Sequence, residues 1–126
     1  MTRILVVEDD RDIRELLMDT LSDMGHEVID AEDGGAGLRR ALKELPDIIL
    51  LDVMMPVMDG FQLLEKLKED FITRSILVIM VSAKGQEQDV LAAMKAGAWG
   101  YIIKPWEPDE LESKVMNAAA QVCKAG

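Results

Sequence analysis

The sequence predicts an α/β domain, a doubly wound sandwich around a mainly parallel sheet. Short apolar runs rich in β-branched residues alternate five times with longer segments of helical period. The first, third and fourth runs are continuously apolar, as expected of strands that helices cover on both faces. The expected strands are residues 4–7, 27–31, 48–51, 76–81 and 100–103.

Five helices are expected between and after these strands, at residues 11–24, 35–45, 61–70, 86–96 and 108–123. The first has an apolar stripe that should face inward, followed by Gly25 where a C-terminal cap is expected. The stripe is Ile13, Leu16, Leu17, Thr20, Leu21 and Met24. Right-handed crossovers place helices on both faces of the sheet and ligands at the carboxyl ends of the strands.

The length and composition are those of one globular domain over residues 1–126, and residues 122–126 could begin a linker in a longer parent protein. Fourteen Lys and Arg against 24 Asp and Glu give a net charge of -10, which argues against direct nucleic-acid binding. No apolar run is long enough to span a membrane, and the N-terminus lacks a signal-peptide pattern, so a cytoplasmic location is expected. The single cysteine, Cys123, is interpreted as structural or incidental.

Polar residues directly follow four of the predicted strands. They are Glu8, Asp9 and Asp10 after the first, Asp52 after the third, Ser82 after the fourth, and Lys104 with Pro105 after the fifth. Because these positions share one edge of a parallel sheet, we expect the side chains to converge. Crowded carboxylates require neutralisation, and hard oxygen ligands suit Mg²⁺, with Mn²⁺ as a substitute.

Asp9 and Asp52 are the predicted direct ligands, with a backbone carbonyl near Met54 as a third. Glu8 or Asp10 could hold ordered water, although Asp10 could instead only cap the next helix. With a cation bound, the Asp52 carboxylate could act as a nucleophile toward a phosphoryl group and form an acyl phosphate. Lys104 and Ser82 would bind the phosphoryl oxygens; the alternatives are a solvated surface lysine and a helix cap.

Four segments closely resemble the receiver domain of two-component response regulators: residues 4–10, 50–60, 81–83 and 97–105. The resemblance covers essentially the whole chain and implies a (βα)5 flavodoxin-like fold with strand order 2-1-3-4-5. By this match Asp52 is the phosphoacceptor, and Asp9, Asp52 and the Met54 carbonyl hold Mg²⁺. Glu8 is then the supporting acid, and Ser82 and Lys104 grip the phosphoryl group.

The resemblance also implies that the chain is a switch and not a turnover enzyme. Tyr101 matches an aromatic residue whose inward or outward rotamer accompanies movement of the Ser82 hydroxyl, and the Lys104–Pro105 peptide is expected to be cis. Met54 and Lys84 border the path of the hydrolytic water, and we expect them to shield the acyl phosphate and slow its self-hydrolysis.

The implied partners are a sensor histidine kinase or phosphotransfer protein and a downstream output domain or target. The readout surface should be the fourth helix, fifth strand and fifth helix, and a phosphorylation-dependent homodimer is compatible with it. Its candidate contacts are Trp99, Trp106, Ala92, Lys95 and Glu110, with simple packing as the alternative for the tryptophans.

Three other functions share part of this pattern. A small Mg²⁺-dependent phosphohydrolase also uses a strand-end aspartate. Such enzymes usually carry an Asp-x-Asp motif, whereas here the residue two positions after Asp52 is Met54. A phosphorylation-independent adaptor with a degenerate receiver fold would lack one or more of the site residues, all of which are present. A flavin-binding module needs a phosphate-cradling loop after the first strand, where the acids Glu8, Asp9 and Asp10 would repel the phosphate.

Overall fold

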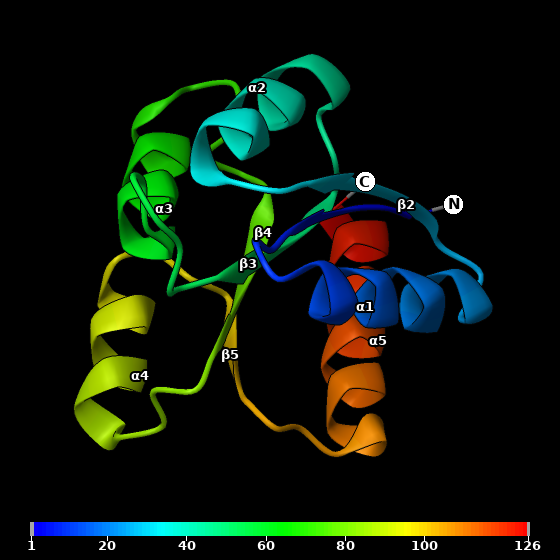
Figure 1. Ribbon diagram of the computed structural model, residues 1–126. Helices are drawn as coiled ribbons and strands as arrows, with labels where there is room; N and C mark the ends of the chain where they lie inside the picture. The colour runs from blue at the N-terminus through cyan, green and yellow to red at the C-terminus, as the bar shows by residue number, and fades with distance from the viewer. Residues whose placement is uncertain (1, 126) are drawn as a thin grey trace.

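The computed structural model describes residues 2–125 and contains five strand–helix pairs in sequence order (Figure 1). The elements are β1 Arg3–Val7, α1 Arg11–Asp23, β2 Glu27–Ala31, α2 Gly34–Glu44, β3 Ile48–Asp52, α3 Gly60–Glu69, β4 Leu77–Ser82, α4 Glu87–Lys95, β5 Gly100–Ile103 and α5 Pro108–Ala125. Every predicted element is therefore present, with ends that differ by at most two residues. Ile76, expected to open the fourth strand, is buried but precedes it.

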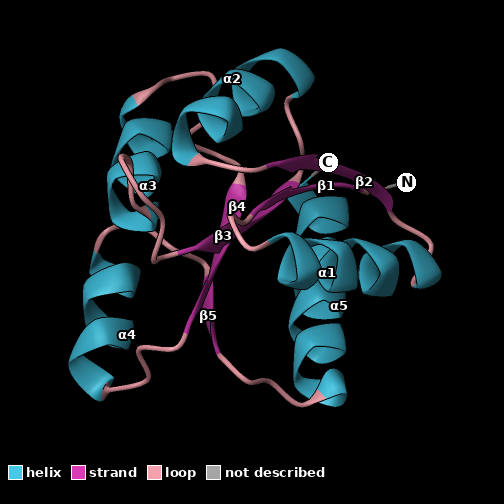
Figure 2. Cartoon of the chain, in the orientation of Figure 1, coloured by secondary structure: helices cyan, strands magenta, loops and turns pink. Residues whose placement is uncertain are grey.

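All strand pairs are parallel, and the strand order is β2-β1-β3-β4-β5, which confirms the expected topology. The sheet runs through the middle of the molecule with α1 and α5 on one side and α2, α3 and α4 on the other (Figure 2). The buried side chains accordingly form two separate apolar cores, one on each face of the sheet.

Alternate residues of the central strands contribute to opposite cores, as the two-residue period of a strand requires. Val7, Leu51, Met80 and Tyr101 occupy one row across the sheet and pack on the α2, α3 and α4 side. The next residue toward the amino end of each strand packs on the α1 and α5 side, as Val6 and Leu50 do. All five residues of β3 are buried, which confirms that helices cover both of its faces.

Helix caps place the start of each early helix close to the strand before it. Asp10 caps α1 by accepting hydrogen bonds from the backbone N–H groups of Asp12 and Ile13, at 2.9 and 3.1 Å. Asp59 caps α3 in a reciprocal pair with Gln62. These caps satisfy backbone groups that a helix end leaves unpaired, and they define where α1 and α3 begin at the carboxyl edge of the sheet.

The stripe predicted for the first helix is wrong at one position. Leu17 and Leu21 are buried, but Leu16 is 55% exposed. Leu16 precedes Leu17 by one residue, so it is rotated about 100° around the helix and points along the edge of the interface instead of into it. Gly25 follows α1 with φ of +92°, a conformation that favours glycine.

The last helix continues through Ala125, so residues 122–125, where a linker could have begun, are helical. Gly126 lies outside the described residues. Within residues 2–125, the structure contains no helix with the length and hydrophobicity needed to cross a bilayer.

The start of α3 depends on the absence of a side chain at Gly60. A Cβ atom there would lie 2.5 Å from the backbone oxygen of Asp52 and 2.8 Å from the Cα of Val53. We therefore expect Gly60→Ala to lower the free energy of unfolding by about 1–3 kcal/mol, measured by urea denaturation. Gly35→Ala is the matched control, because its Cβ would meet only the Asp33 and Arg39 side chains at 3.4 and 3.5 Å. It should be neutral or stabilising by up to about 1 kcal/mol, and equal effects of the two substitutions would contradict the prediction.

Candidate functional site

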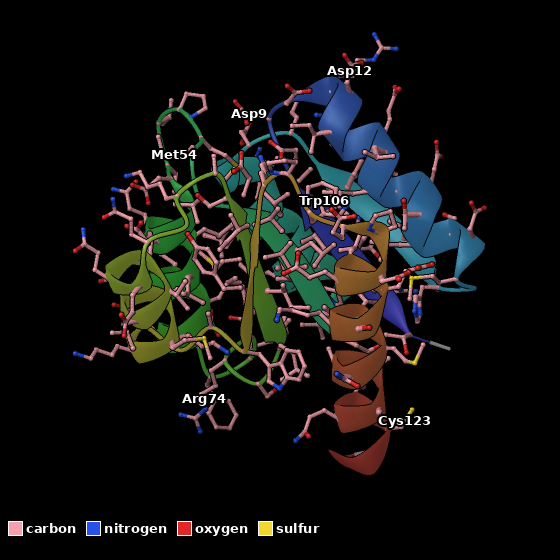
Figure 3. All side chains as sticks on the ribbon, turned by 90° about the horizontal axis from the view of Figure 1, so that it is seen from below. Asp9, Asp12, Met54, Arg74, Trp106 and Cys123 are labelled. Atoms are coloured by element: carbon pink, nitrogen blue, oxygen red, sulfur yellow. The ribbon has the colours of Figure 1, made fainter. Side chains whose placement is uncertain are left out.

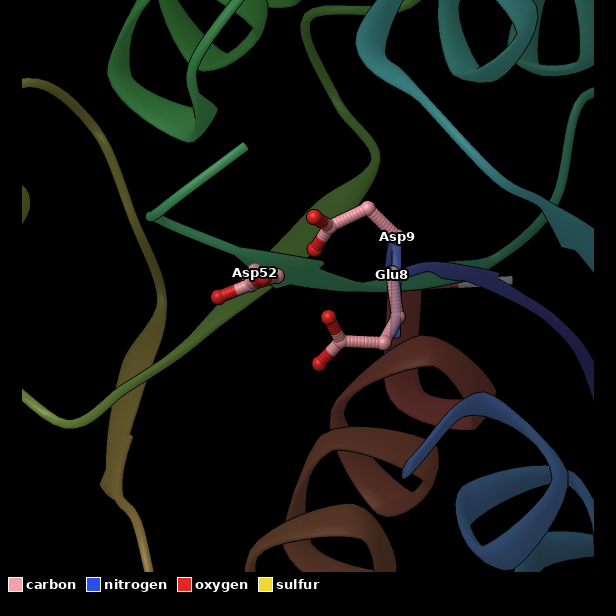
Figure 4. Close-up of side chains that lie close together, drawn as sticks. All are labelled: Glu8, Asp9 and Asp52. Atoms are coloured by element: carbon pink, nitrogen blue, oxygen red, sulfur yellow. The ribbon is translucent and has the colours of Figure 1, made fainter. Parts of the chain in front are cut away.

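Three carboxylates converge at the carboxyl edge of the sheet, as the sequence predicts. Asp9 lies at the opposite end of the molecule from Arg74 and Cys123 (Figure 3). The close-up shows the carboxylates of Glu8, Asp9 and Asp52 turned toward a common space (Figure 4), and one oxygen of each lies within 4.8 Å of the others. Glu8 is 1% exposed and Asp52 4%, whereas Asp9 is exposed. Two of the acids are therefore sheltered, and the third faces solvent.

The strand register explains why these residues meet. Val7 pairs with Leu51, so the next residues along, Glu8 and Asp52, are neighbours at the ends of β1 and β3. Glu8 continues the ladder by donating its N–H to the carbonyl of Ala31 at 3.1 Å. Lys104 continues it on the other side by donating its N–H to the carbonyl of Ser82 at 2.8 Å. The alternation of side chains then sends Glu8, Asp52 and Lys104 to the same face of the sheet.

Lys104 lies between the two sheltered acids. Its Nζ is 2.9 Å from Oε1 of Glu8 and 3.3 Å from Oδ1 of Asp52. Burial alone would lower the pKa of Lys104, but its hydrogen bond to Glu8 and the charges of Glu8 and Asp52 outweigh burial and raise it. The ammonium group therefore stays charged. The Lys104–Pro105 peptide is cis, as expected.

Glu8 is the most perturbed acid of the cluster. Burial, followed by its interaction with Asp52, raises the pKa of Glu8 from 4.5 to about 7, although its hydrogen bond to Lys104 acts in the opposite direction. Its second oxygen, Oε2, accepts a hydrogen bond from the N–H of Asp10 at 3.2 Å. The protein thus holds a carboxyl group that ionises with difficulty unless more positive charge is brought to it.

The donor atoms fit a hard divalent cation. Three carboxylate oxygens at this separation match the ligands that Mg²⁺ prefers, and the exposure of Asp9 leaves a side open for water or a phosphate oxygen. Asp10 is not part of this group: one oxygen of its carboxylate caps α1. The interpretation of Asp10 as a cap is therefore supported, and the role of the Met54 carbonyl as a third ligand stays a prediction.

Ser82 and Tyr101 meet at the backbone of Lys84. The Ser82 Oγ atom accepts a hydrogen bond from the N–H of Lys84 at 3.0 Å, and the Tyr101 hydroxyl donates one to its carbonyl at 2.6 Å. Ser82 is fully buried and Tyr101 is 7% exposed, so the tyrosine is in an inward position. The two residues predicted to act as a pair are therefore connected through one intervening residue.

Met54 and Lys84 lie close to Asp52 and Ser82 in the chain, and their predicted role in shielding the acyl phosphate stays a prediction. The Met54 N–H donates to Oδ1 of Asp52 at 3.2 Å, and the Met54 side chain is 55% exposed. Met54 and Lys84 line one hollow together with Asp59 and Tyr101. Their side chains thus stand on the α3 and α4 side of Asp52.

The predicted readout surface is exposed on α4 and on the start of α5. Ala92, Lys95 and Glu110 are exposed, and three large apolar side chains lie on α4 and β5: Leu91, Met94 and Ile103. Trp99 and Trp106 instead pack partly buried against the core on the α1 and α5 side. For the tryptophans the packing interpretation is therefore the better supported one.

Two contributors to the site were missed by sequence reasoning. Arg14 donates from Nη1 to the carbonyl of Glu8 at 2.9 Å, and its position between Ile13 and Leu17 on the inward face of a helix was an available signal. The backbone of Lys84 joins Ser82 to Tyr101, and no sequence signal could reveal it, because almost every residue carries the same backbone groups.

Comparison with known proteins agrees with this geometry. Residues 4–116 match the family model of the response regulator receiver domain. The chain is 40% identical over 113 residues to the phosphate regulon transcriptional regulatory protein PhoB of Escherichia coli, covering 90% of this chain and 49% of that protein. The chain spans about half the length of the curated relatives that it matches.

Solved structures give the same result. A CheY-like response regulator receiver domain protein from Methanospirillum hungatei superposes with a TM-score of 0.91 at 32% identity, covering 100% of this chain and 99% of that one. The chemotaxis protein CheY4 of Vibrio cholerae gives 0.88 at 30% identity, covering 94% and 98%. A domain of this kind is a signalling switch. By its sequence match, its fold and the geometry of its acidic edge, the chain belongs to the response regulator receiver domain family.

Proposed function

We propose that this domain accepts a phosphoryl group on Asp52 and converts its presence into a change of the α4–β5–α5 surface. One observation carries the proposal: the Asp52 carboxylate, 4% exposed, lies 3.3 Å from the Lys104 ammonium and beside two further carboxylates. A lysine alone would make this a buried ion pair. With Glu8 and Asp9 added, the cluster contains three carboxylates and one ammonium group, and a bound cation would neutralise the excess negative charge.

Asp9 and Asp52 would hold Mg²⁺ directly, with the Met54 carbonyl as a third protein ligand and Glu8 as supporting acid. When bound, the cation neutralises charge on the carboxylates and on the phosphoryl oxygens, so that the anionic donor can approach. Burial raises the pKa of Glu8 first and the neighbouring Asp52 raises it further, and a cation bound at the cluster would oppose the second effect.

In the proposed reaction a carboxylate oxygen of Asp52 attacks the phosphorus atom of a phosphohistidine. The new O–P bond forms as the P–N bond breaks, and the electron pair stays on the imidazole nitrogen. Lys104 and the Ser82 hydroxyl would bind the phosphoryl oxygens and stabilise the charge that develops on them. Water later attacks the phosphorus atom, the bond between phosphorus and the Asp52 oxygen breaks, and inorganic phosphate leaves. The domain would thus catalyse both its own phosphorylation and its own dephosphorylation.

The phosphohistidine would belong to a sensor histidine kinase or phosphotransfer protein. An apolar groove between α1 and the connection from β5 to α5 supports this, because its lining reaches Lys104 and therefore the site. Its lining includes Ile13, Leu16, Pro105 and Trp106. The unexpected exposure of Leu16 adds apolar surface at the edge of this groove, where a helix of the donor could pack.

The output would be read on the other side of the site. If the Ser82 hydroxyl moves to donate to a phosphoryl oxygen, it would leave the N–H of Lys84 from which it now accepts a hydrogen bond, and this would bias the position of Tyr101. The exposed apolar residues Leu91, Met94 and Ile103 suit an output domain, a separate target, or a second phosphorylated copy of the domain.

The phosphoacceptor assignment predicts the result of treatment with acetyl phosphate and Mg²⁺. Intact-mass spectrometry should detect one added phosphoryl group on the wild-type protein and none on Asp52→Asn. Asp12→Asn is the control: Asp12 is an exposed acid in the first turn of α1, near the site but outside the acid cluster, and its variant should be modified like wild type. Modification that survives Asp52→Asn would disprove the assignment.

The shielding role of Met54 predicts a change in phosphate lifetime. In Met54→Asn an amide replaces the thioether and can bind the attacking water, so the rate of dephosphorylation should rise roughly two- to tenfold, equivalent to about 0.4–1.4 kcal/mol in the barrier. Met116→Asn replaces an exposed methionine on α5 and should leave the rate unchanged. Loss of radiolabel from the phosphorylated protein measures both, and equal rates in Met54→Asn and wild type would show that no shielding occurs.

The raised pKa of Glu8 predicts that the free energy of unfolding depends on pH in the absence of divalent cations. Because the pKa of Glu8 is about 7 in the folded protein and near 4.5 in the unfolded chain, its contribution to stability is fully present below about pH 4.5 and is lost as the pH rises through 7. The amide side chain introduced by Glu8→Gln cannot ionise. The free energy of unfolding of this variant, relative to that of the wild-type protein, should therefore rise by on the order of 1–3 kcal/mol over this pH range.

Urea denaturation in EDTA at pH 5 and pH 8 measures this difference. Glu107→Gln, at an exposed acid before α5, should follow the wild-type pH profile. The prediction is wrong if the gap between Glu8→Gln and wild type is the same at both pH values.

A further inference from the structure

We propose that Arg14 is a positioning residue for the carboxylate cluster. By fixing the peptide group between Glu8 and Asp9, it would set where the Asp9 carboxylate lies and thereby the affinity of the site for Mg²⁺. The inference rests on the proposed function to the extent that the carboxylates bind a cation. Arg14 is not a ligand and contacts none of the three carboxylates.

The Arg14 side chain reaches two different strands from α1. Its Nη1 donates to the carbonyl oxygen of Glu8 at 2.9 Å, and its Nε lies 3.2 Å from Oδ2 of Asp30 on β2. The Arg14 side chain is 14% exposed and Glu8 is 1% exposed, so the bond to the Glu8 carbonyl is largely shielded from competing water, whereas the Asp30 side chain is 38% exposed. Because a guanidinium group is planar and rigid, anchoring Nε on Asp30 fixes the direction from which Nη1 meets the Glu8 carbonyl.

The contact acts on Asp9 through the geometry of the peptide bond. The carbonyl of Glu8 and the N–H of Asp9 belong to one planar unit, so a bond that fixes the first also fixes the second and the Cα of Asp9. The rest of Glu8 is already held, by the carbonyl of Ala31 at its N–H and by Lys104 at its side chain. Arg14 adds the restraint on the carbonyl, which is the part of Glu8 that leads into Asp9.

Asp9 depends on this restraint more than the other two acids do. Glu8 and Asp52 are buried and hydrogen-bonded, whereas Asp9 is exposed and its carboxylate accepts no hydrogen bond from the described part of the chain. Its backbone must therefore supply the orientation that its surroundings do not. A ligand that is not preorganised loses conformational freedom when it binds the cation, and the affinity falls accordingly.

A purely electrostatic role for Arg14 would have the opposite effect. A cation near the cluster repels Mg²⁺, so removing it would leave the site more negative and tighten binding. Asp30, 3.2 Å from the guanidinium, already compensates much of that charge and would remain uncompensated after the substitution, which again favours tighter binding. The sign of the change in affinity therefore separates positioning from electrostatics.

The experiment measures Mn²⁺ binding by the electron paramagnetic resonance signal of the free ion, with Mg²⁺ affinity obtained by competition. Arg14→Met should weaken both by about 10- to 100-fold, the range typical of residues that orient metal ligands. Arg11→Met is the matched control: it removes the same charge from the same helix, but Arg11 is 80% exposed and pairs with Glu15. It should bind Mn²⁺ within twofold of wild type.

Arg14→Lys keeps the charge and loses the planar fork, so it should still weaken binding at least fivefold, and it serves as the test variant should Arg14→Met fail to fold. Urea denaturation in EDTA shows separately whether either variant is destabilised, since a role in packing alone would lower stability and leave the affinity unchanged. Unchanged or tighter binding by the folded variants overturns the inference about Arg14 alone. Failure of the wild-type protein to bind Mn²⁺ overturns the proposed function and this inference with it.

Discussion

The ammonium group of Lys104 between the carboxylates of Glu8 and Asp52 is the contact around which the rest of the domain is arranged. Charges withdrawn from water are tolerated only when each has a partner at short range, and here two acids share one cation. The register of the strands meets that requirement, because it brings the carboxyl ends of β1, β3 and β5 to one edge of the sheet. Three residues separate the end of β1 from the start of α1, and the last of them, Asp10, caps the helix next to this edge.

The two-residue period of the strands divides the work of the site between two faces. The positions of Glu8, Asp52 and Lys104 follow the rows that pack toward α1 and α5, the side of the apolar groove. Tyr101 belongs to the opposite core, beneath α4. Lys104 and Tyr101 therefore point to opposite faces of the sheet, and Ser82, at the end of β4, is connected to Tyr101 through the backbone of Lys84.

The fold could be predicted from the sequence because each strand is a short apolar run and each helix carries its own end signals. The convergence of Glu8, Asp9 and Asp52 was predictable for a topological reason: the carboxyl ends of parallel strands share one edge. The exposure of Leu16 was not, because a six-residue apolar stripe is wider than the interface that the helix forms. Whether a residue on the margin of such a stripe is covered depends on the neighbouring elements.

The contacts made by backbone groups lie beyond sequence reasoning altogether. Arg14 binds a carbonyl and Tyr101 binds another, and neither acceptor is distinguished by its residue type. Sequence patterns report side chains, so they identify the ligands of a site better than the residues that orient them.

The link between Ser82 and Tyr101 has an evolutionary consequence. It uses only the main chain of Lys84, so the side chain at this position is free to change without breaking the connection. The same residue lines one hollow together with Met54. Under the proposed function, substitution at position 84 would alter the duration of a signal while the main-chain link that transmits it is inherited intact.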